Sequence, residues 1–288
     1  MNCPLCDYSK SRPSWVGSTY YLRRAFSYFE CLSCGSLYCD PMPDAETLAQ
    51  MYGPDYGNNF GADPSGDDSK DSRRVLELVK KLNAGTFIDY GCGGGELLVE
   101  VAKLEWRAIG IEFDPQVATA VEDRTGLQIL TQHQAEKLPG LSVDILHLGD
   151  VIEHLTDLDC QMPEIVKLVR PGGLVVAQGP LEANLCLFTL LVRFTRALRR
   201  ERRTEMAPYH VLLATAKGQR SLFQRLGLRE IEYQISEVAW PAPARLSLAD
   251  IWRLRSITLF VLRRVSQAIS ALGFAQMGNR YFYVGQRI

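Results

Sequence analysis

The sequence lacks several features that define common classes of protein. No apolar run reaches the roughly 18–20 residues that a transmembrane helix needs. The first residues, Met1-Asn2-Cys3-Pro4, show no charged region followed by an apolar stretch, so no secretory signal is visible. Histidine is scarce, with only four in 288 residues. We therefore expect a cytoplasmic protein with few side chains suited to general base chemistry near neutral pH.

An excess of positive charge is also missing. The chain has 32 basic and 33 acidic side chains and a pI near 6.4. A nucleic-acid binder commonly uses a positive field to neutralise phosphates, so nucleic acid is not the expected partner. Hydrophobic residues make up 47% and charged residues 23%, values typical of a globular protein. In a reducing compartment the eight cysteines should be reduced, metal-bound or buried rather than paired in disulfides.

The composition changes along the chain and predicts three parts. Four cysteines lie in the first 34 residues, and GPDYGNNFGADPSGDD at 53–68 is rich in glycine, proline and aspartate. Such a composition is typical of a flexible connection. We predict a small module at 1–52, a linker at 53–68 and a main domain at 69–288. Helical insertions are expected at about 183–205 and 246–272.

The main domain alternates between helical and strand patterns. After Ser69, SRRVLELVKKL has helical spacing, TFIDYG is a buried strand, ELLVEVAKL a helix and RAIGIEF a second strand. Helices near 115–125 and 157–170 and strands at Leu127–Leu130, Asp144–Leu148 and Gly173–Gln178 continue the pattern. GQRSLFQRLGLREIEYQI predicts a helix and a strand, and RYFYVGQRI a last strand. This alternation predicts an α/β fold, Rossmann-like, with a parallel sheet covered on both faces.

A glycine-rich loop follows the first strand of this domain. Its residues are Asp89-Tyr90-Gly91-Cys92-Gly93-Gly94-Gly95. A dinucleotide fingerprint needs G-x-G-x-x-G, and counting from Gly91 places Glu96 where the third glycine should be. Asp89 and Glu96 would repel a diphosphate but attract the sulfonium and ammonium of S-adenosylmethionine. The loop therefore favours a cationic cofactor over NAD.

Glu112 ends the second strand, 23 residues after Asp89. A carboxylate at this position can accept hydrogen bonds from both ribose hydroxyls of either cofactor. The alternative is a common glycine turn followed by a surface acid. The loop and the acid together favour a cofactor site.

Two cysteine pairs in the N-terminal module have the spacing of zinc ligands. Cys3-x-x-Cys6 and Cys31-x-x-Cys34 each bring two sulfurs toward one tetrahedral ion, and 24 residues separate the pairs. Four thiolates leave no open position for water, so the predicted zinc is structural. The alternative is that these cysteines are buried or redox-active. Cys39 is expected in the core, and the other cysteines have no partner at ligand spacing.

Four segments resemble the motifs of class I S-adenosylmethionine-dependent methyltransferases over about residues 70–180. They are FIDYGCGGGELL, GIEFDP, DILHLGDVIEHL and LVRPGGLVVAQGP, in the order of that family. The resemblance implies that the cofactor contacts Asp89, Gly91, Cys92, Gly93, Glu112, Phe113, Gln134, Ala135, Leu148 and Gly149. In it, Glu112 takes the ribose, Gln134 and Ala135 lie by the adenine, and Leu148 and Gly149 border the methionyl end.

The N-terminal segment ECLSCGSLYCDPMP, followed by Tyr52 and Tyr56, resembles the zinc ribbon of bacterial sugar and polysaccharide methyltransferases. This resemblance implies an acceptor among sugars, glycans or related small metabolites, and we expect methylation of a hydroxyl. Two other functions stay open. One is an RNA methyltransferase with a zinc module, and the other is a noncatalytic binding module on the same scaffold.

A hydroxyl acceptor needs a base, and histidine is the natural candidate. His154 follows Asp150 and Glu153 at the carboxyl edge of the sheet, where it either lies near the methyl group or only holds the loop. His210 resembles a family position that helps to close the pocket. His147 is expected in the sheet core, and His133 in local structure.

The two predicted insertions are rich in arginine and apolar residues. The first contains Arg193, Arg196, Arg199, Arg200, Arg202 and Arg203, and WRLRSITLFVLRR at 252–264 belongs to the second. Such helices lie on an anionic membrane surface, bind the phosphates of an activated sugar or simply face solvent. Peripheral contact with the inner membrane face would suit a lipid-linked glycan acceptor.

Overall fold

The computed structural model describes residues 1–52, 68–138, 142–198, 203–238, 254–272 and 276–288. The predicted linker at 53–68, apart from residue 68, and Tyr56 lie outside these residues. The chain forms two compact units. The first contains Met1–Asp67, Pro180–Arg220 and Gln234–Tyr281, and the second contains Asp68–Gly179, Ser221–Tyr233 and Phe282–Ile288.

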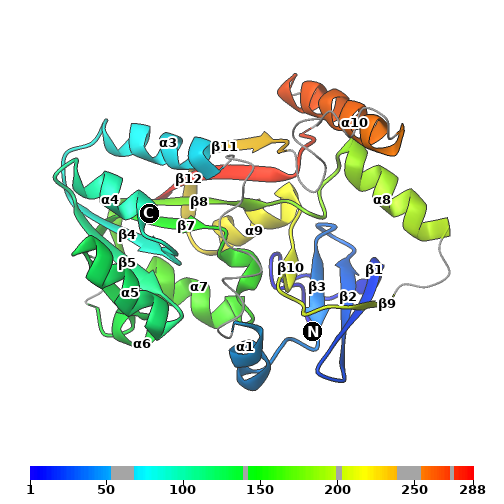
Figure 1. Ribbon diagram of the computed structural model, residues 1–288, viewed down its shortest axis with the longest axis horizontal. Coiled ribbons are helices and arrows are strands. Elements are labelled where there is room, and N and C mark those ends of the chain that lie inside the picture. The colour runs from blue at the N-terminus through cyan, green and yellow to red at the C-terminus, as the bar shows by residue number, and fades with distance from the viewer. Residues whose placement is uncertain (53–67, 139–141, 199–202, 239–253, 273–275) are drawn as a thin grey trace. The chain divides into compact units, whose positions relative to one another are not determined.

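A seven-stranded sheet forms the centre of the second unit (Figure 1). Its strands are β4 (Thr86–Tyr90), β5 (Arg107–Glu112), β6 (Gln128–Thr131), β7 (Val143–Gly149), β8 (Val169–Pro180), β11 (Leu228–Ser236) and β12 (Arg280–Arg287). They lie in the order β11-β12-β8-β7-β4-β5-β6. The pairs β4–β5, β4–β7, β5–β6 and β7–β8 are parallel. This arrangement confirms the predicted Rossmann-like α/β fold.

The helices of this unit alternate with the strands, and most of them fall on segments whose apolar periodicity predicts a helix. They are α3 (Asp68–Val79), α4 (Glu96–Ala102), α5 (Pro115–Thr125), α6 (Gln132–Ala135), η1 (Ile152–His154) and α7 (Leu158–Val166), with α9 (Ala216–Arg225) shared by the two units. Val75 of α3 and Leu98 of α4 pack in one core with Phe87, Ile145 and Val176 of the sheet. Burial of these side chains holds the helices against the strands.

The ends of α5 illustrate why local sequence locates a helix well. Asp114 caps its first turn by accepting hydrogen bonds from the N–H groups of Gln116 and Val117, and Pro115 occupies the first helical position. Gly126 ends the helix with a φ of 68°, a left-handed conformation that suits glycine.

Strand β8 begins earlier than the sequence pattern predicts. It pairs with β7 at Val169 and again from Leu174, with a shift of register between the two. Pro171 has no N–H to donate, and Gly172 has a φ of 78°, so the chain bulges between these paired positions. The helix expected near 157–170 accordingly ends at Val166.

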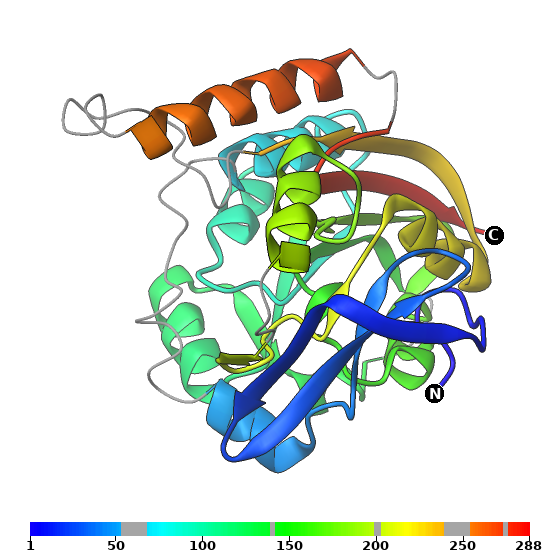
Figure 2. The same ribbon diagram turned by 90° about the vertical axis from the view of Figure 1, so that its right-hand side faces the viewer.

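The first unit contains a five-stranded sheet, with its N-terminal strands coloured blue in Figure 2. Its strands are β1 (Ser11–Tyr21), β2 (Arg24–Cys31), β3 (Leu37–Asp40), β9 (Arg203–Glu205) and β10 (Leu212–Leu213), in the order β10-β3-β2-β1-β9. β9 pairs with β1 in parallel, and β10 pairs with β3 antiparallel. The structure thus groups the chain differently from the sequence-based division, because two later strands complete the edges of the N-terminal sheet.

Three further helices belong to the first unit: α1 (Ala45–Met51), α8 (Leu187–Leu198) and α10 (Leu254–Ala271). The N–H of Leu187 donates to Ser266 Oγ at 3.3 Å, which joins α8 to α10. Arg263 and Glu237 form a buried ion pair at 2.5 Å, and Ser266 donates to the same carboxylate. The two helices cover parts of the predicted insertions, of which residues 199–202 and 246–253 are outside the described residues. No helix among the described residues is long and apolar enough to span a bilayer.

Candidate functional site

The glycine loop joins β4 to α4 at the centre of the parallel sheet. β4 has β5 on one side and β7 on the other, so successive connections leave it in opposite directions. Open α/β sheets bind ligands at such a switch point, beyond the carboxyl ends of the strands. A Cβ at Gly91 would lie 2.7 Å from Val151 Cγ2, whereas a Cβ at Gly93 would have nothing within 4 Å. The loop is therefore tightly packed at Gly91 and open at Gly93.

Glu112 holds this loop in place. Its Oε2 accepts a hydrogen bond from Gly93 N at 2.9 Å, and its Oε1 accepts one from Phe113 N at 2.8 Å. Burial raises the pKa of the Glu112 carboxyl above its ordinary value. Each carboxylate oxygen has two lone pairs, so the group can still accept hydrogen bonds from a ligand. Glu112 is thus part of the loop structure rather than a simple surface acid.

Asp89 lies at the base of the loop and forms a pair with His147. The two residues are each only 4% exposed, and Asp89 Oδ1 lies 2.6 Å from His147 Nδ1. They are register partners in the neighbouring strands β4 and β7. His147 is in the sheet core as expected, but its pairing with Asp89 was missed. Only the strand order, which the sequence pattern does not contain, places these residues side by side.

The other predicted cofactor contacts have varied surroundings. Cys92 belongs to the hydrophobic core, where its Sγ would lie 2.7 Å from a Cβ at Gly110, and its N–H donates to Ile111 O at 3.1 Å. Gln134 Oε1 accepts a hydrogen bond from Thr131 N at 2.8 Å and thereby caps α6. Among the other predicted contacts, Phe113 is exposed and Ala135 and Leu148 are buried. Gly149 is half-buried at the end of β7. Contact of these residues with a cofactor stays a prediction.

The two histidines proposed as bases belong to different units. His154 is half-buried at the end of η1, directly after β7. His210 is half-buried in the first unit, and its Nδ1 lies 2.7 Å from Glu182 Oε2. Base chemistry by either residue stays a prediction.

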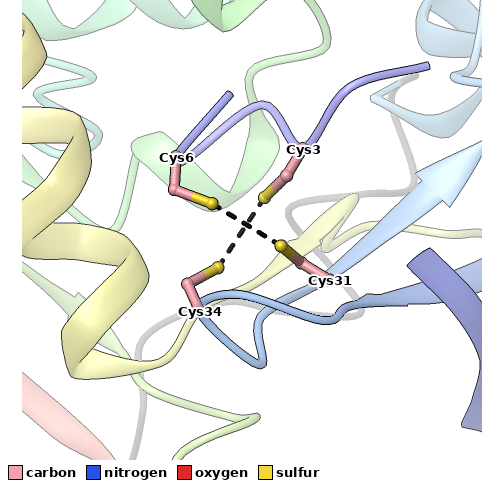
Figure 3. A group of neighbouring side chains, drawn as sticks. All are labelled: Cys3, Cys6, Cys31 and Cys34. Atoms are coloured by element: carbon pink, nitrogen blue, oxygen red, sulfur yellow. Dashed lines mark hydrogen bonds between the residues drawn. The ribbon is translucent and has the colours of Figure 1, made fainter. Parts of the chain in front are cut away.

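The four N-terminal cysteines converge on one point (Figure 3). The Sγ atoms of Cys3 and Cys34 lie 3.7 Å apart and those of Cys6 and Cys31 lie 3.5 Å apart. All four lie within 4.8 Å of one another. A tetrahedral zinc with Zn–S bonds of about 2.3 Å needs sulfurs roughly 3.8 Å apart. The donor set and its spacing therefore fit a zinc ion, and the predicted grouping of these cysteines is confirmed.

Residues far along the chain support this cysteine cluster. Thr215 donates its hydroxyl to Cys34 O at 2.7 Å and its N–H to Ser36 Oγ at 2.9 Å. Lys217 Nζ donates to Ser33 O at 2.7 Å. The turn that carries the second cysteine pair is thus bound to the start of α9.

Comparison with known proteins agrees with this geometry. Residues 88–177 match the family described as a methyltransferase domain. The ubiquinone biosynthesis O-methyltransferase of Rhizobium etli is 32% identical over 123 residues, which cover 41% of this chain and 45% of that protein. The ribosomal protein L11 methyltransferase of Vibrio cholerae is 30% identical over 151 residues, which cover 50% and 48%. The chain thus spans about half the length of these curated relatives.

Solved structures show the same fold at low sequence identity. A methyltransferase dependent on S-adenosylmethionine from Archaeoglobus fulgidus has a TM-score of 0.51 at 15% identity and covers 85% of this chain and 100% of that chain. Geranyl diphosphate methyltransferase in complex with S-adenosylmethionine also has a TM-score of 0.51, at 12% identity, covering 87% and 98%. The second unit therefore has the Rossmann-like α/β fold seen in methyltransferases, and residues 88–177 match the family model of a methyltransferase domain.

Proposed function

We propose that this protein transfers the methyl group of S-adenosylmethionine to an acceptor molecule. The observation that carries the proposal is the placement of Asp89 and Glu112 around an open glycine loop at the switch point of the sheet. A pyrophosphate would meet two carboxylates there, whereas a sulfonium cofactor carries positive charge that these groups attract. The match of residues 88–177 to methyltransferases supports the same cofactor.

The residues of this site act by binding and orientation. When bound, S-adenosylmethionine would supply an electrophilic methyl group, and in-line displacement requires the acceptor to approach it from the opposite side. Glu112 would accept hydrogen bonds from the ribose hydroxyls while it holds Gly93. Asp89, fixed by His147, would keep negative charge beneath the methionyl end. His154 is our candidate for the base that accepts the acceptor's proton.

The acceptor we propose is a hydroxyl group of a sugar, a glycan or a related small metabolite. The resemblance of the N-terminal segment to enzymes of sugar and polysaccharide biosynthesis supports this class. Relatives named O-methyltransferases also support oxygen as the methylated atom.

The four-cysteine cluster is proposed to hold a structural zinc ion. Burial raises the pKa of the Cys6 thiol to about 11, whereas the hydrogen bond with Cys3 lowers the pKa of the Cys34 thiol to about 5, so a cation bound here would displace the proton of Cys6. The ion would then tie the N-terminal residues to β2 and, through Thr215, to the start of α9.

Helices α8 and α10 are proposed to contact an anionic membrane surface. Neither contains aspartate or glutamate. Each exposes apolar side chains four residues apart, Leu190 and Phe194 on α8 and Val261 and Val265 on α10. Apolar residues combined with arginine suit the boundary between headgroups and acyl chains, where a lipid-linked acceptor would be found.

Calorimetry with S-adenosylhomocysteine and with NAD⁺ tests the proposed function directly. We expect the first compound to bind and the second to give no heat of binding. An Asp89→Ala variant should lose S-adenosylhomocysteine binding. If NAD⁺ binds and S-adenosylhomocysteine does not, the proposed activity is wrong. Transfer of radioactive methyl groups to glycans but not to RNA would separate the acceptor classes, and no transfer to any acceptor would favour the noncatalytic module.

A further inference from the structure

Three residues at the start of α9 lie against the turn that carries the second cysteine pair. They are Thr215, Lys217 and Gly218, and they belong, like the four cysteines, to the first unit. Thr215 lies 181 positions after Cys34 in the sequence. These three residues supply no thiolate, so they act on the proposed zinc through the backbone and side chains that hold the cysteines.

The hydroxyl of Thr215 makes contacts in two directions. It donates its hydrogen to Cys34 O at 2.7 Å, and it accepts a hydrogen bond from Gly218 N at 3.1 Å. The second bond caps the first turn of α9, where the N–H groups have no acceptor within the helix. One oxygen atom therefore connects the cysteine turn to the helix cap.

Ser36 strengthens this connection from the side of the cysteine turn. Its Oγ accepts a hydrogen bond from Thr215 N at 2.9 Å and lies 3.0 Å from Thr215 Oγ1. Because Thr215 Oγ1 gives its one hydrogen to Cys34 O, Ser36 supplies the hydrogen of the bond between the two hydroxyls. Ser36 is buried, so water does not compete for these bonds.

Gly218 allows α9, the yellow helix in Figure 3, to approach the cluster closely. A Cβ at this position would clash with Ser36 Oγ and would lie 3.2 Å from Cys34 Sγ. Ser36 cannot readily move aside, because its short side chain is bonded to Thr215. The first turn of α9 therefore packs against the sulfur of a proposed zinc ligand.

Lys217 adds a positive charge beside the same turn. Its Nζ donates to the carbonyl oxygen of Ser33, the residue before Cys34, at 2.7 Å. Zinc bound by four thiolates has a net negative charge, which an ammonium attracts. The Lys217 side chain is exposed, so solvent screens this attraction and the bonds of Thr215 contribute more.

We propose that zinc binding is coupled to the first turn of α9, with Thr215 as the residue that positions Cys34. Its hydrogen bonds hold the backbone of Cys34 where the four sulfurs converge, so less conformational freedom is lost when the ion binds. Because such coupling is reciprocal, bound zinc must stabilise the first turn of α9 by the same factor. This inference rests on the proposed structural zinc and gives its site a determinant outside the predicted module at 1–52.

Competition for zinc between the reduced, full-length protein and a chromophoric chelator tests the role of Thr215. Thr215→Val keeps the shape of the side chain but removes the hydroxyl, and it should bind zinc about tenfold more weakly. Thr215→Ser keeps the hydroxyl and should bind zinc within about twofold of wild type. The matched control is Thr131→Val, which removes the hydroxyl that caps α6 in the second unit and should leave zinc affinity unchanged.

Hydrogen exchange tests the reciprocal effect of zinc on α9. The N–H of Gly218 bonds to the hydroxyl of Thr215, and the N–H of Gln219 bonds to its carbonyl oxygen. In the wild-type protein both amides should exchange about tenfold more slowly with zinc than after its removal by a chelator. In Thr215→Val this difference should fall to less than about twofold.

Three results would overturn the inference. One is a zinc affinity of Thr215→Val equal to that of wild type. Another is an equal loss of affinity in Thr131→Val, which would indicate a general effect of helix capping. The third is exchange at Gly218 and Gln219 that does not depend on zinc, a measurement that needs only the wild-type protein. A wild-type protein that binds no zinc would instead refute the proposed structural ion.

Discussion

Replacing Glu112 by glutamine tests how the loop and the cofactor site depend on one carboxylate. The two oxygens of Glu112 accept hydrogen bonds from Gly93 N at 2.9 Å and Phe113 N at 2.8 Å. An amide has one oxygen and one NH₂ group, so one of the two backbone N–H groups would face a donor instead of an acceptor. The ribose would also lose its charged acceptor.

General hydrogen-bond energies give the size of the expected effect. A hydrogen bond to a charged group contributes about 1.5–3 kcal/mol. Loss of one such bond to the ribose corresponds to roughly a 10- to 150-fold weaker affinity for S-adenosylhomocysteine. The mismatched N–H should lower the free energy of unfolding by about 1–3 kcal/mol.

Calorimetry and urea denaturation of Glu112→Gln measure these two effects separately. Glu96→Gln is the matched control, because Glu96 begins α4 directly after the loop and its side chain is 82% exposed. Its charge is screened by solvent, and we expect less than a twofold change in affinity. Unchanged binding by Glu112→Gln, or an equal loss in Glu96→Gln, would refute the role assigned to Glu112.

The same carboxylate predicts a pH dependence of binding. Burial raises the pKa of Glu112, so this group takes up a proton at a higher pH than an ordinary glutamate as the pH falls. The protonated form is a poorer acceptor for the ribose hydroxyls. Affinity for S-adenosylhomocysteine should therefore fall as the pH is lowered through this raised pKa, and should stay nearly flat in Glu112→Gln. A flat wild-type profile from pH 7.5 to 4.5 would contradict this assignment.

Three other changes test the rest of the molecule. Elemental analysis should find one zinc per chain, which Cys31→Ser should lose and the exposed control Cys160→Ser should keep. Removal of the zinc by a chelator should lower Tm by more than about 10 °C. A metal-free protein with an unchanged Tm would contradict a structural ion. Gly110→Ala should lower the free energy of unfolding by about 1–3 kcal/mol in urea, because its Cβ would lie 2.7 Å from neighbouring side-chain atoms; a stability equal to wild type would show that this core can expand. At low salt the protein should sediment together with phosphatidylglycerol vesicles. Phe194→Ser should reduce the vesicle-bound fraction several-fold, whereas Ile231→Ser, a control at another exposed apolar residue, should leave it unchanged. Equal binding to phosphatidylcholine, or none to either lipid, would argue against the membrane contact.

Much of the second unit could be predicted from the sequence because its signals are local. Helix α5 has a capping aspartate, a proline in the first turn and a glycine at its end. The glycine loop and Glu112 follow their strands directly, so a reader of the sequence can assign them to one edge of a parallel sheet. The two cysteine pairs predict their convergence because a two-residue gap turns both sulfurs to one side.

Other features depend on contacts between residues far apart in the chain, which no local pattern records. β9 and β10 contain three and two residues, too few for a recognisable periodicity, yet they complete the sheet formed by β1, β2 and β3. The bulge in β8 likewise depends on its register with β7.

The pair formed by Asp89 and His147 marks the division most clearly. The sequence by itself determined that His147 lies within a buried strand and that Asp89 begins the loop. Only the tertiary structure decided that β7 lies between β4 and β8, because strand order follows from the packing of the whole sheet. That order turns a core histidine into the partner of the loop aspartate, which no local pattern in the sequence records.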